Sequence, residues 1–257
     1  MKIASWNVNS LNVRLPHLEQ WLQAAAPDVV GLQETKLEDN RFPDAVLAGL
    51  GYRSVFAGQK TYNGVALLAR GHALDEVQIG IPGFDDAQRR AIAATANGVR
   101  IVNLYVVNGQ DVGTEKYDYK LRWLDAVHGW LSDELRQHPR LVVMGDFNIA
   151  PDDRDVHDPQ MWNDDSILTS TAERAALKRL FDLGLHDAYR LHHTEGGQFS
   201  WWDYRQAGFR RNLGLRIDLT LVSDALRLNA DAAGIDREPR TWERPSDHAP
   251  VWVRLKE

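Results

Sequence analysis

The sequence predicts an α/β protein in which helices pack outside two mostly antiparallel sheets. Three observations lead to this class. Short apolar runs typical of buried strands recur along the chain, apolar residues at helical spacing lie between some of them, and hairpin-like strand pairs outnumber strict β-α-β alternation. No low-complexity linker divides the 257 residues, so we expect a single domain over residues 1–257.

Each expected strand is a run of mainly apolar residues. In chain order the runs span residues 3–7, 29–33, 52–57, 65–69, 100–106, 141–144, 216–222 and 251–255. The runs that begin at residues 3 and 141 both end in polar groups, which is a faint internal echo. The echo suggests two similar halves that meet at one cleft.

Apolar residues at helical spacing predict three helices. Leucines recur at this spacing before Pro27 and again before Pro139, and each proline is expected to follow the end of its helix. The third helix begins at a capping box, in which Ser170 and Glu173 satisfy backbone groups of the first turn. Gly184 is the expected stop of that helix.

Charge and cysteine content limit the classes of function. The formal net charge is −6, which argues against a general nucleic-acid coat, because neutralising phosphates needs a basic face. An enzyme that acts on DNA is still compatible with this charge, since bound metal offsets a carboxylate-rich site. Zero cysteines exclude disulfides, thiolate zinc sites and cysteine nucleophiles, and they fit a reducing compartment.

The N-terminal segment lacks the apolar region of a signal peptide, and no apolar run approaches the roughly 20 residues that span a bilayer. We therefore expect a soluble cytoplasmic protein. Local basic clusters are candidates for a DNA-facing surface, although such clusters are more often solvated surface. The clusters comprise Arg89, Arg90, the run of residues 116–122, Arg205, Arg210, Arg211 and Arg216.

Polar residues beside the apolar runs supply the candidate chemistry. Glu34 follows a buried-looking run and could bind Mg²⁺ or Mn²⁺, because hard cations prefer carboxylate oxygen. The alternative is a solvated glutamate at a strand end. Asp146 and Asn148 lie two residues apart and would point the same way on a strand. Asp146 could then deprotonate the attacking water, while Asn148 holds Asp146 and a phosphate oxygen. The alternative is a turn that ends the strand.

A histidine near the last strand is the candidate for proton transfer near neutral pH. Asp218 lies within an apolar strand and needs a partner there, and His248 is our candidate. Alternatives are an ion pair between Arg216 and Asp218, and a loop-capping role for Asp247. Together with Asn7, these residues form a set suited to metal-assisted hydrolysis of a phosphodiester.

Five motifs occur in an order that resembles exonuclease III, the bacterial abasic-site endonuclease group of the endonuclease/exonuclease/phosphatase superfamily. The resemblance runs from the first strand to the last and therefore covers essentially the whole chain. The motifs are Trp6-Asn7-Val8-Asn9, Leu32-Gln33-Glu34-Thr35-Lys36, Gly145-Asp146-Phe147-Asn148, Gly214-Leu215-Arg216-Ile217-Asp218 and Ser246-Asp247-His248.

The resemblance implies a four-layer α/β sandwich and a role for each matching residue. Glu34 would be the main metal ligand, with Asn7 supporting the ligand set and Asp247 beside it. The cofactor would be one or two ions of Mg²⁺ or Mn²⁺.

Asp146 would be the general base, and Asn148 would position it. His248, paired with Asp218, would bind the scissile phosphate. Under a two-metal scheme, Asp146, Asn148 and His248 would instead hold the second ion. Tyr105 matches the active-site tyrosine of the family.

The run of residues 198–205 resembles the loop that recognises a missing base. A sugar without its base flips out cheaply and enters a small apolar pocket that an intact nucleotide cannot enter. Trp201 would form the pocket wall, with Phe209 as a second candidate, and one of the two adjacent tryptophans is expected in the core. The expected contacts to flanking phosphates are Arg90, Lys116 and Arg205. The sequence departs from the family at Val107, where proline is common, and this affects the loop after Tyr105.

The expected function is a metal-dependent phosphodiesterase that cuts duplex DNA 5′ to abasic sites and trims 3′ ends, including 3′-to-5′ exonuclease activity. We expect a monomer whose partner is double-stranded DNA. One alternative is another metal-dependent phosphatase or a non-specific nuclease of the same fold. A second alternative is a non-catalytic DNA-binding relic.

Overall fold

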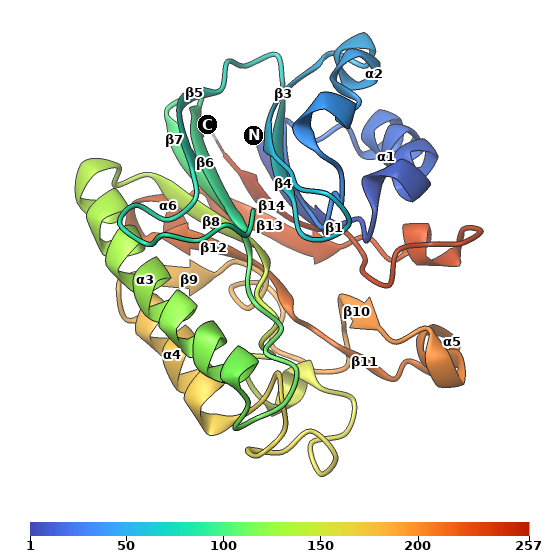
Figure 1. The fold of residues 1–257 in the computed structure, drawn as a ribbon, viewed down its shortest axis with the longest axis vertical. Coiled ribbons are helices and arrows are strands. Elements are labelled where there is room, and N and C mark those ends of the chain that lie inside the picture. The colour runs from blue at the N-terminus through green and yellow to red at the C-terminus, as the bar shows by residue number, and fades with distance from the viewer. Residues whose placement is uncertain (257) are drawn as a thin grey trace.

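The computed structural model describes residues 1–256, and residue 257, the last of the predicted domain, lies outside the described residues. Two six-stranded sheets form its centre (Figure 1). The first has the order β13-β14-β1-β2-β4-β3, with β1 (Lys2–Asn7), β2 (Val29–Gln33), β3 (Tyr52–Ala57), β4 (Val65–Arg70), β13 (Ala230–Ile235) and β14 (Val251–Leu255). The second has the order β5-β6-β7-β8-β12-β9, with β5 (Asp75–Ile79), β6 (Ala91–Ala96), β7 (Val99–Tyr105), β8 (Leu141–Asp146), β9 (Leu185–Asp187) and β12 (Asp218–Ser223).

Helices cover the outer faces of both sheets, which gives four layers (Figure 1). The longer helices are α1 (Leu11–Ala25), α3 (Glu115–Gln137) and α4 (Thr171–Phe181), and the shorter ones are α2 (Asp44–Gly49), α5 (Gly208–Arg211) and α6 (Asp224–Arg227). The side chains of β1 point alternately to the two faces of its sheet, and this explains the layering. Ala4 and Trp6 pack under α1, whereas Ile3 joins the core between the sheets. The predicted α/β fold class is confirmed.

Two strand pairs are parallel and set the position of the candidate site. β1 runs parallel to β2, and β7 runs parallel to β8, whereas the other pairings within the two sheets are antiparallel. The carboxyl ends of β1 and β2 therefore lie at one edge, and those of β7 and β8 lie at one edge of the second sheet. β12 is antiparallel to β8 and begins where β8 ends, since Asp218 is opposite Asp146.

A buried polar bridge fixes the two sheets against each other close to that edge. Asn103 of β7 donates hydrogen bonds to the carbonyls of Leu32 and Ala66 in the first sheet, both at 2.9 Å. Its own amide oxygen accepts from Gln33 Nε2 at 2.6 Å. Every donor and acceptor of the Asn103 amide has a fixed partner, so the bridge favours one register of sheet on sheet.

The predicted elements agree with the structure except at a few places. The capping box of α4 forms as predicted between Ser170 and Glu173. The strand expected at residues 216–222 is wrong at its start, because β12 begins at Asp218 and a separate short strand, β11 (Gly214–Leu215), pairs with β10 (Trp201–Trp202). The backbone of Arg216 instead bonds to Asp155, which draws this segment away from the sheet.

Alanine-rich strands were not predicted. β6 reads Ala-Ile-Ala-Ala-Thr-Ala and β13 reads Ala-Asp-Ala-Ala-Gly-Ile, and alanine has a low intrinsic preference for strands. Pairing with neighbouring strands, with β5 and β7 for β6 and with β14 for β13, decides their conformation. Among the described residues, no helix has the length and apolar character needed to cross a membrane.

Candidate active site

Polar side chains from both sheets meet at the edge where the parallel strands end. They come from the ends of β1, β7 and β8, from the residue after β2, from the start of β12 and from the loop before β14. The side chains are Asn7, Glu34, Tyr105, Asp146, Asp218 and His248. The structure thus brings together residues that lie as far apart in sequence as Asn7 and His248. Neither sheet alone could form this cluster.

Asn7 joins the two carboxylates at the centre of the cluster. Its Nδ2 donates to Glu34 Oε1 and to Asp146 Oδ2, both at 2.9 Å. Its Oδ1 accepts from the backbone N–H of Asn9 at 3.0 Å, which fixes the orientation of the amide. Asn7 therefore supports the carboxylates with its nitrogen.

Glu34 has the more open position of the two carboxylates. Its side chain is 18% exposed, and Lys36 Nζ lies 3.0 Å from its Oε2. The backbone of Glu34 is in the left-handed region, with φ of 51°, immediately after β2. This turn out of the strand directs the carboxylate toward the edge of the sheet.

A divalent cation fits this donor set. Glu34, Asp146 and His248 each offer a ligand atom, and these atoms lie within 4.8 Å of one another. Carboxylate oxygens are the ligands that hard cations prefer, and imidazole suits transition metals. Lys36 and the imidazole of His248 are two cationic groups beside three buried or half-buried carboxylates, Glu34, Asp146 and Asp218. A positive ion would relieve their repulsion.

Asp146 is buried and held by three neighbours. Its Oδ1 accepts from the backbone N–H of Asn148 at 2.9 Å, and its Oδ2 lies 3.7 Å from His248 Nε2. Burial raises the pKa of the Asp146 carboxyl, and the positive charge of His248 lowers it by less. The negative charges of Asp218 and Glu34 raise this pKa further. The Asp146 carboxylate is therefore a stronger base than an exposed aspartate.

The side chain of Asn148 is turned away from Asp146. Its Nδ2 donates to the carbonyl of Val106 at 3.0 Å, and its Oδ1 accepts from Asn108 Nδ2 at 3.1 Å. The residue has φ of 49°, a conformation that asparagine tolerates better than most residues. Asn148 thus acts on Asp146 through its backbone N–H.

His248 and Asp218 form the expected pair. His248 Nδ1 lies 2.9 Å from Asp218 Oδ2 and 3.1 Å from Oδ1. Burial alone would lower the pKa of His248, but the carboxylates of Asp218 and Asp146 outweigh it and raise the pKa to about 10. The imidazole is therefore a cation with one N–H committed to Asp218.

The alternative ion pair between Arg216 and Asp218 is wrong. Arg216 is buried and pairs with Asp155 at 2.6 Å and with Asp187 at 2.7 Å. Besides His248, Asp218 contacts Ser200, whose hydroxyl donates to Asp218 Oδ2 at 2.6 Å. Ser200 also accepts from the backbone N–H groups of residues 217 and 218.

Tyr105 lies at the end of β7, opposite Asp146 in the pairing of β7 with β8. Burial and the charges of Glu34 and Asp146 raise the pKa of the Tyr105 hydroxyl well above its usual value. The hydroxyl therefore stays protonated and is a donor. The guanidinium of Arg90 lies 4.6 Å from the centre of the Tyr105 ring, and Val107 follows as a buried residue.

Asp247 lies beside the carboxylate cluster, with both its oxygens already bonded. Its Oδ1 accepts from Asn9 Nδ2 at 3.0 Å, and its Oδ2 accepts from Trp201 Nε1 at 3.0 Å. It therefore connects the edge that carries the carboxylate cluster to the tryptophan predicted to line the substrate pocket.

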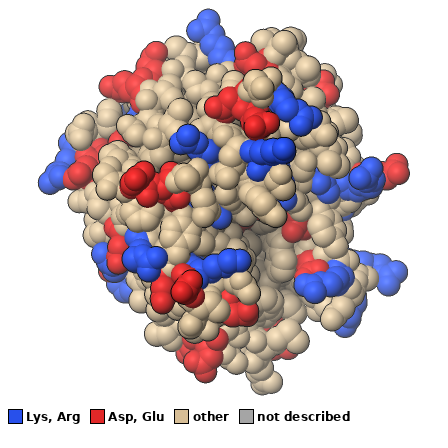
Figure 2. Space-filling view, viewed as in Figure 1, with Lys and Arg blue, Asp and Glu red and all other residues tan. Residues whose placement is uncertain are grey.

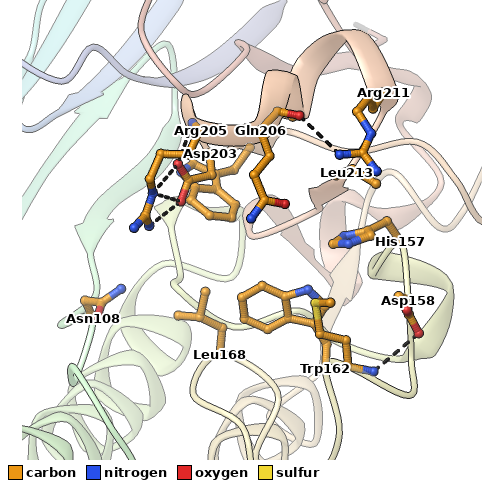
Figure 3. A pocket seen from close by; sticks show the side chains of 13 residues that line it. Asn108, His157, Asp158, Trp162, Leu168, Asp203, Arg205, Gln206, Arg211 and Leu213 are labelled. Atoms are coloured by element: carbon orange, nitrogen blue, oxygen red, sulfur yellow. Dashed lines mark hydrogen bonds and ion pairs between the residues drawn. The ribbon is translucent and has the colours of Figure 1, made fainter.

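A cavity of about 640 Å³ opens next to this connection (Figure 3). Trp201 lines it, as predicted for the pocket wall. Trp202 is fully buried, so the expectation that one of the pair lies in the core is confirmed. Phe209 packs edge-on against the buried Trp202, with ring centres 5.0 Å apart.

The other walls of this cavity were not predicted. His157 and Trp162 pack at a steep angle, and Figure 3 shows the Trp162 ring between Leu168 and His157, away from Asp203 and Arg205. They belong to a long irregular segment without a motif. Asn108 also lines this cavity.

A second cavity, of about 560 Å³, lies on the other side of Asn108. Arg90 and Lys116 both line it, as expected for contacts to phosphates. Figure 2 shows the molecule hollowed beside the lobe that contains β10, β11 and α5, with lysine and arginine side chains on both sides. Arg205 lies on that lobe, exposed, and pairs with Asp203 at 2.6 Å.

Two of the predicted basic surface residues are buried instead. Lys120, within the run 116–122, is fully enclosed and pairs with Glu173, and Arg216 is enclosed by its two aspartates. Neither side chain can face DNA. Lys120 is buried because it lies on the inward face of α3. The charged residues beside it in the sequence conceal this position.

Comparisons with known proteins agree with this geometry. The chain is 37% identical to exodeoxyribonuclease III of Haemophilus influenzae over 271 residues, and the match covers all of both chains. It is 47% identical to a solved structure of the 3′ phosphatase NExo from Neisseria bound to product DNA hairpin, with a TM-score of 0.98 and full coverage of both chains. It is 34% identical to an AP endonuclease from Archaeoglobus fulgidus, again with full coverage and a TM-score of 0.96.

The family model for the Endonuclease/Exonuclease/phosphatase family matches residues 4–248, which include every polar residue of the cluster. This match, the full-length relatives and the two packed sheets show that the chain belongs to the Endonuclease/Exonuclease/phosphatase family.

Proposed function

We propose that this DNA repair nuclease is a Mg²⁺- or Mn²⁺-dependent phosphodiesterase that cuts duplex DNA 5′ to abasic sites and processes 3′ ends. The observation that carries the proposal is the position of the Trp201 cavity. The Asp247 carboxylate bonds to Trp201 Nε1 and is adjacent in the chain to His248, so one hydrogen bond and one peptide link join the pocket wall to the carboxylate cluster. A sugar in the cavity would present its 5′ phosphate to that cluster.

The chain's own residues supply the proton transfers and the binding of the phosphate. Asp146 takes a proton from water, because its raised pKa makes it an effective base. The water oxygen attacks phosphorus, the bond from phosphorus to the 3′ oxygen breaks, and that oxygen takes a proton from solvent to leave a 3′-hydroxyl. His248, held as a cation by Asp218, binds the non-bridging oxygens, and Tyr105 donates a hydrogen bond nearby.

Glu34 would be the principal ligand of the cation, with Asn7 bracing its carboxylate. When bound, the cation supplies positive charge that stabilises the departing oxygen. Under a two-metal scheme, Asp146, Asn148 and His248 would hold a second ion, and this would require His248 to give up the proton on Nε2.

Substrate selection would depend on the cavity and on the basic residues around it. An intact nucleotide carries a base that collides with the walls, whereas a baseless sugar can enter. Arg90 and Lys116 in the second cavity would bind phosphates on one side of the cut. Arg205 would do so on the other side after exchanging its contact with Asp203 for phosphate.

Processing of 3′ ends is a second activity of the same site. Two Neisseria structures with full coverage are described as a 3′ phosphatase and a 3′-5′ exonuclease, and they are 47% and 48% identical to this chain. In a terminal 3′-phosphate, water would likewise attack the phosphorus, and the 3′ oxygen would again be the leaving group. Cytoplasmic location and a monomeric state are part of the proposal.

The decisive experiment uses one labelled duplex with a single tetrahydrofuran abasic analogue and a second duplex with a 3′-phosphate. With Mg²⁺ we expect incision of the first and removal of the phosphate from the second, and with EDTA we expect neither. Turnover of a soluble phosphomonoester, with both duplexes left intact, would contradict the proposal and favour a phosphatase on small substrates.

A further inference from the structure

A fully buried lysine lies beneath the candidate active site and has no part in the mechanism described so far. Lys120 projects from α3, and its Nζ donates to the carbonyl of Asn148 at 2.7 Å and to the carbonyl of Asn108 at 3.1 Å. Its third contact is the carboxylate of Glu173 on α4, which is also fully buried. All three hydrogens of the ammonium group have acceptors.

Glu173 is itself held in place by the start of α4. Its Oε1 accepts from the backbone N–H of Leu168 at 3.1 Å, and its Oε2 accepts from the hydroxyl of Ser170 at 2.6 Å. Ser170 in turn bonds to the hydroxyl of Tyr117, one helical turn before Lys120. The ammonium group is therefore fixed from both helices.

The two carbonyls that Lys120 binds belong to the two loops that shape the site. Asn148 braces the base through its N–H to Asp146 Oδ1 at 2.9 Å. Asn108 lines both cavities and bonds to the side chain of Asn148 at 3.1 Å. Lys120 therefore ties the loop after β8 to the loop after β7 from below, at the residue that orients Asp146.

We propose that Lys120 is a positioning residue for catalysis, which holds the Asn108 and Asn148 loops in the geometry that orients Asp146. The inference rests on the proposed function. Asn148 adopts a positive φ, and such a backbone persists only when its surroundings fix it. A buried ammonium that binds its carbonyl is a fixing group of this kind.

The central test is K120M, which keeps the volume of the side chain and removes its charge. We expect kcat for abasic-site incision to fall about 100-fold, because a small misplacement of a catalytic group has effects of this size. KM for the duplex should change by no more than about threefold, since DNA does not contact Lys120.

A double variant separates positioning from stability. K120M leaves Glu173 as a lone buried charge, which destabilises the fold, whereas K120M/E173M removes both charges. Under the proposal the double variant folds but keeps the low kcat. Recovery of wild-type kcat in K120M/E173M, or its failure to fold, would show that the pair serves only the fold, and either result would overturn the proposal.

The matched control is R100M. Arg100 pairs with Glu134 at 2.7 Å at the opposite end of α3, so this variant also breaks an enclosed ion pair on the same helix. It should lower the melting temperature and leave kcat unchanged at temperatures where it is folded. An equal loss of kcat in R100M would point to general loosening of α3.

The absence of cysteine allows a chemical rescue. K120C can be unfolded, alkylated with 2-bromoethylamine and refolded, which places an ammonium group at nearly the length of lysine. Restored kcat in the alkylated protein supports the proposal, and equally low activity with and without alkylation in a folded protein contradicts it. Wild-type protein carried through the same treatment should be unaffected.

A readout without substrate distinguishes this inference from the proposed function. Hydrogen exchange of the Asn148 N–H, which is bonded to Asp146, should quicken in K120M and stay slow in R100M. If wild-type protein cuts neither duplex, the proposed function fails, while the exchange result still decides whether Lys120 orders this loop.

Discussion

Three carboxylates and one imidazole share the candidate active site, and each has a different environment. Asp146 is enclosed and made more basic, Glu34 is half-buried beside Lys36, and Asp218 is committed to His248 and Ser200. Under the proposed function, these differences would make Asp146 the base, Glu34 the metal ligand and Asp218 the orienting group. Each assignment can be tested by one substitution.

Replacing Asp146 with asparagine removes the base and keeps the shape of the side chain. We expect D146N to slow single-turnover incision by roughly 10²- to 10⁴-fold, the usual range for loss of a general base. Affinity for the duplex, measured by fluorescence anisotropy in EDTA, should stay within about threefold. A rate close to that of wild type would assign the base to another residue.

Under the proposed function, Trp201 would make two separable contributions to substrate recognition. Its ring lines the cavity, and its Nε1 bonds to Asp247. W201F retains most of the apolar wall and loses the hydrogen bond, whereas W201A loses both. We expect W201A to lose roughly 1.5 to 3 kcal/mol of transition-state binding at an abasic site, the range for burial of a large apolar group.

Comparison of kcat/KM for the abasic duplex and the 3′-phosphate duplex checks this expectation. W201F should retain the preference of the wild type, and W201A should lose more on the abasic duplex. Equal losses on both duplexes in W201A would mean that the tryptophan supports the site as a whole.

Sequence reasoning could identify those site residues that lie inside short motifs beside strands. Asn7, Glu34, Asp146, Asp218 and His248 each end or adjoin an apolar run, and the structure brings all of them together. Asn108, His157 and Ser200 could not be assigned roles in this way. They act through tertiary hydrogen bonds or line cavities, and short-range patterns carry no record of either.

At the scale of elements, periodicity predicts long regular segments well. α3 and α4 follow their leucine spacing, and the capping box at Ser170 marks the start of α4. Strands rich in alanine were missed because their conformation is imposed by neighbours. The break at residues 216–217 follows from the buried network of Arg216, which no local pattern discloses.

The close approach of the sheets predicts a sharp contrast between two glycines. A Cβ on Gly31 of β2 would lie 2.7 Å from the side chain of Met144 and 2.8 Å from that of Asn103. G31A should therefore lower the free energy of unfolding by about 1 to 3 kcal/mol, as overpacking does. It should also disturb the polar bridge between the sheets.

Gly49, the last residue of α2, is the matched control, because a Cβ there meets nothing within 4 Å. G49A should be neutral or slightly stabilising, since alanine favours the helix. Urea unfolding of both variants measures the difference. Equal stabilities for G31A and G49A would mean that the sheets adjust freely to each other.

At the scale of the whole molecule, residues from both sheets form one core. Ile3 and Val29 of the first sheet pack in the same cluster as Ile101 and Val142 of the second. A single domain stays a prediction from the sequence, and the shared core supports it. Calorimetry should give one transition whose van't Hoff enthalpy equals the calorimetric enthalpy. Two separable transitions would contradict it.

The order of strands in the first sheet has a consequence for synthesis on the ribosome. β1, the first strand made, lies between β2 and β14, the last strand made. Translation proceeds at about 5 to 20 residues per second, so the slot beside β1 stays open for many seconds after the N-terminus emerges. His248 arrives only just before β14 fills that slot, and a nascent chain therefore cannot assemble the carboxylate cluster until residues 248–255 have been translated.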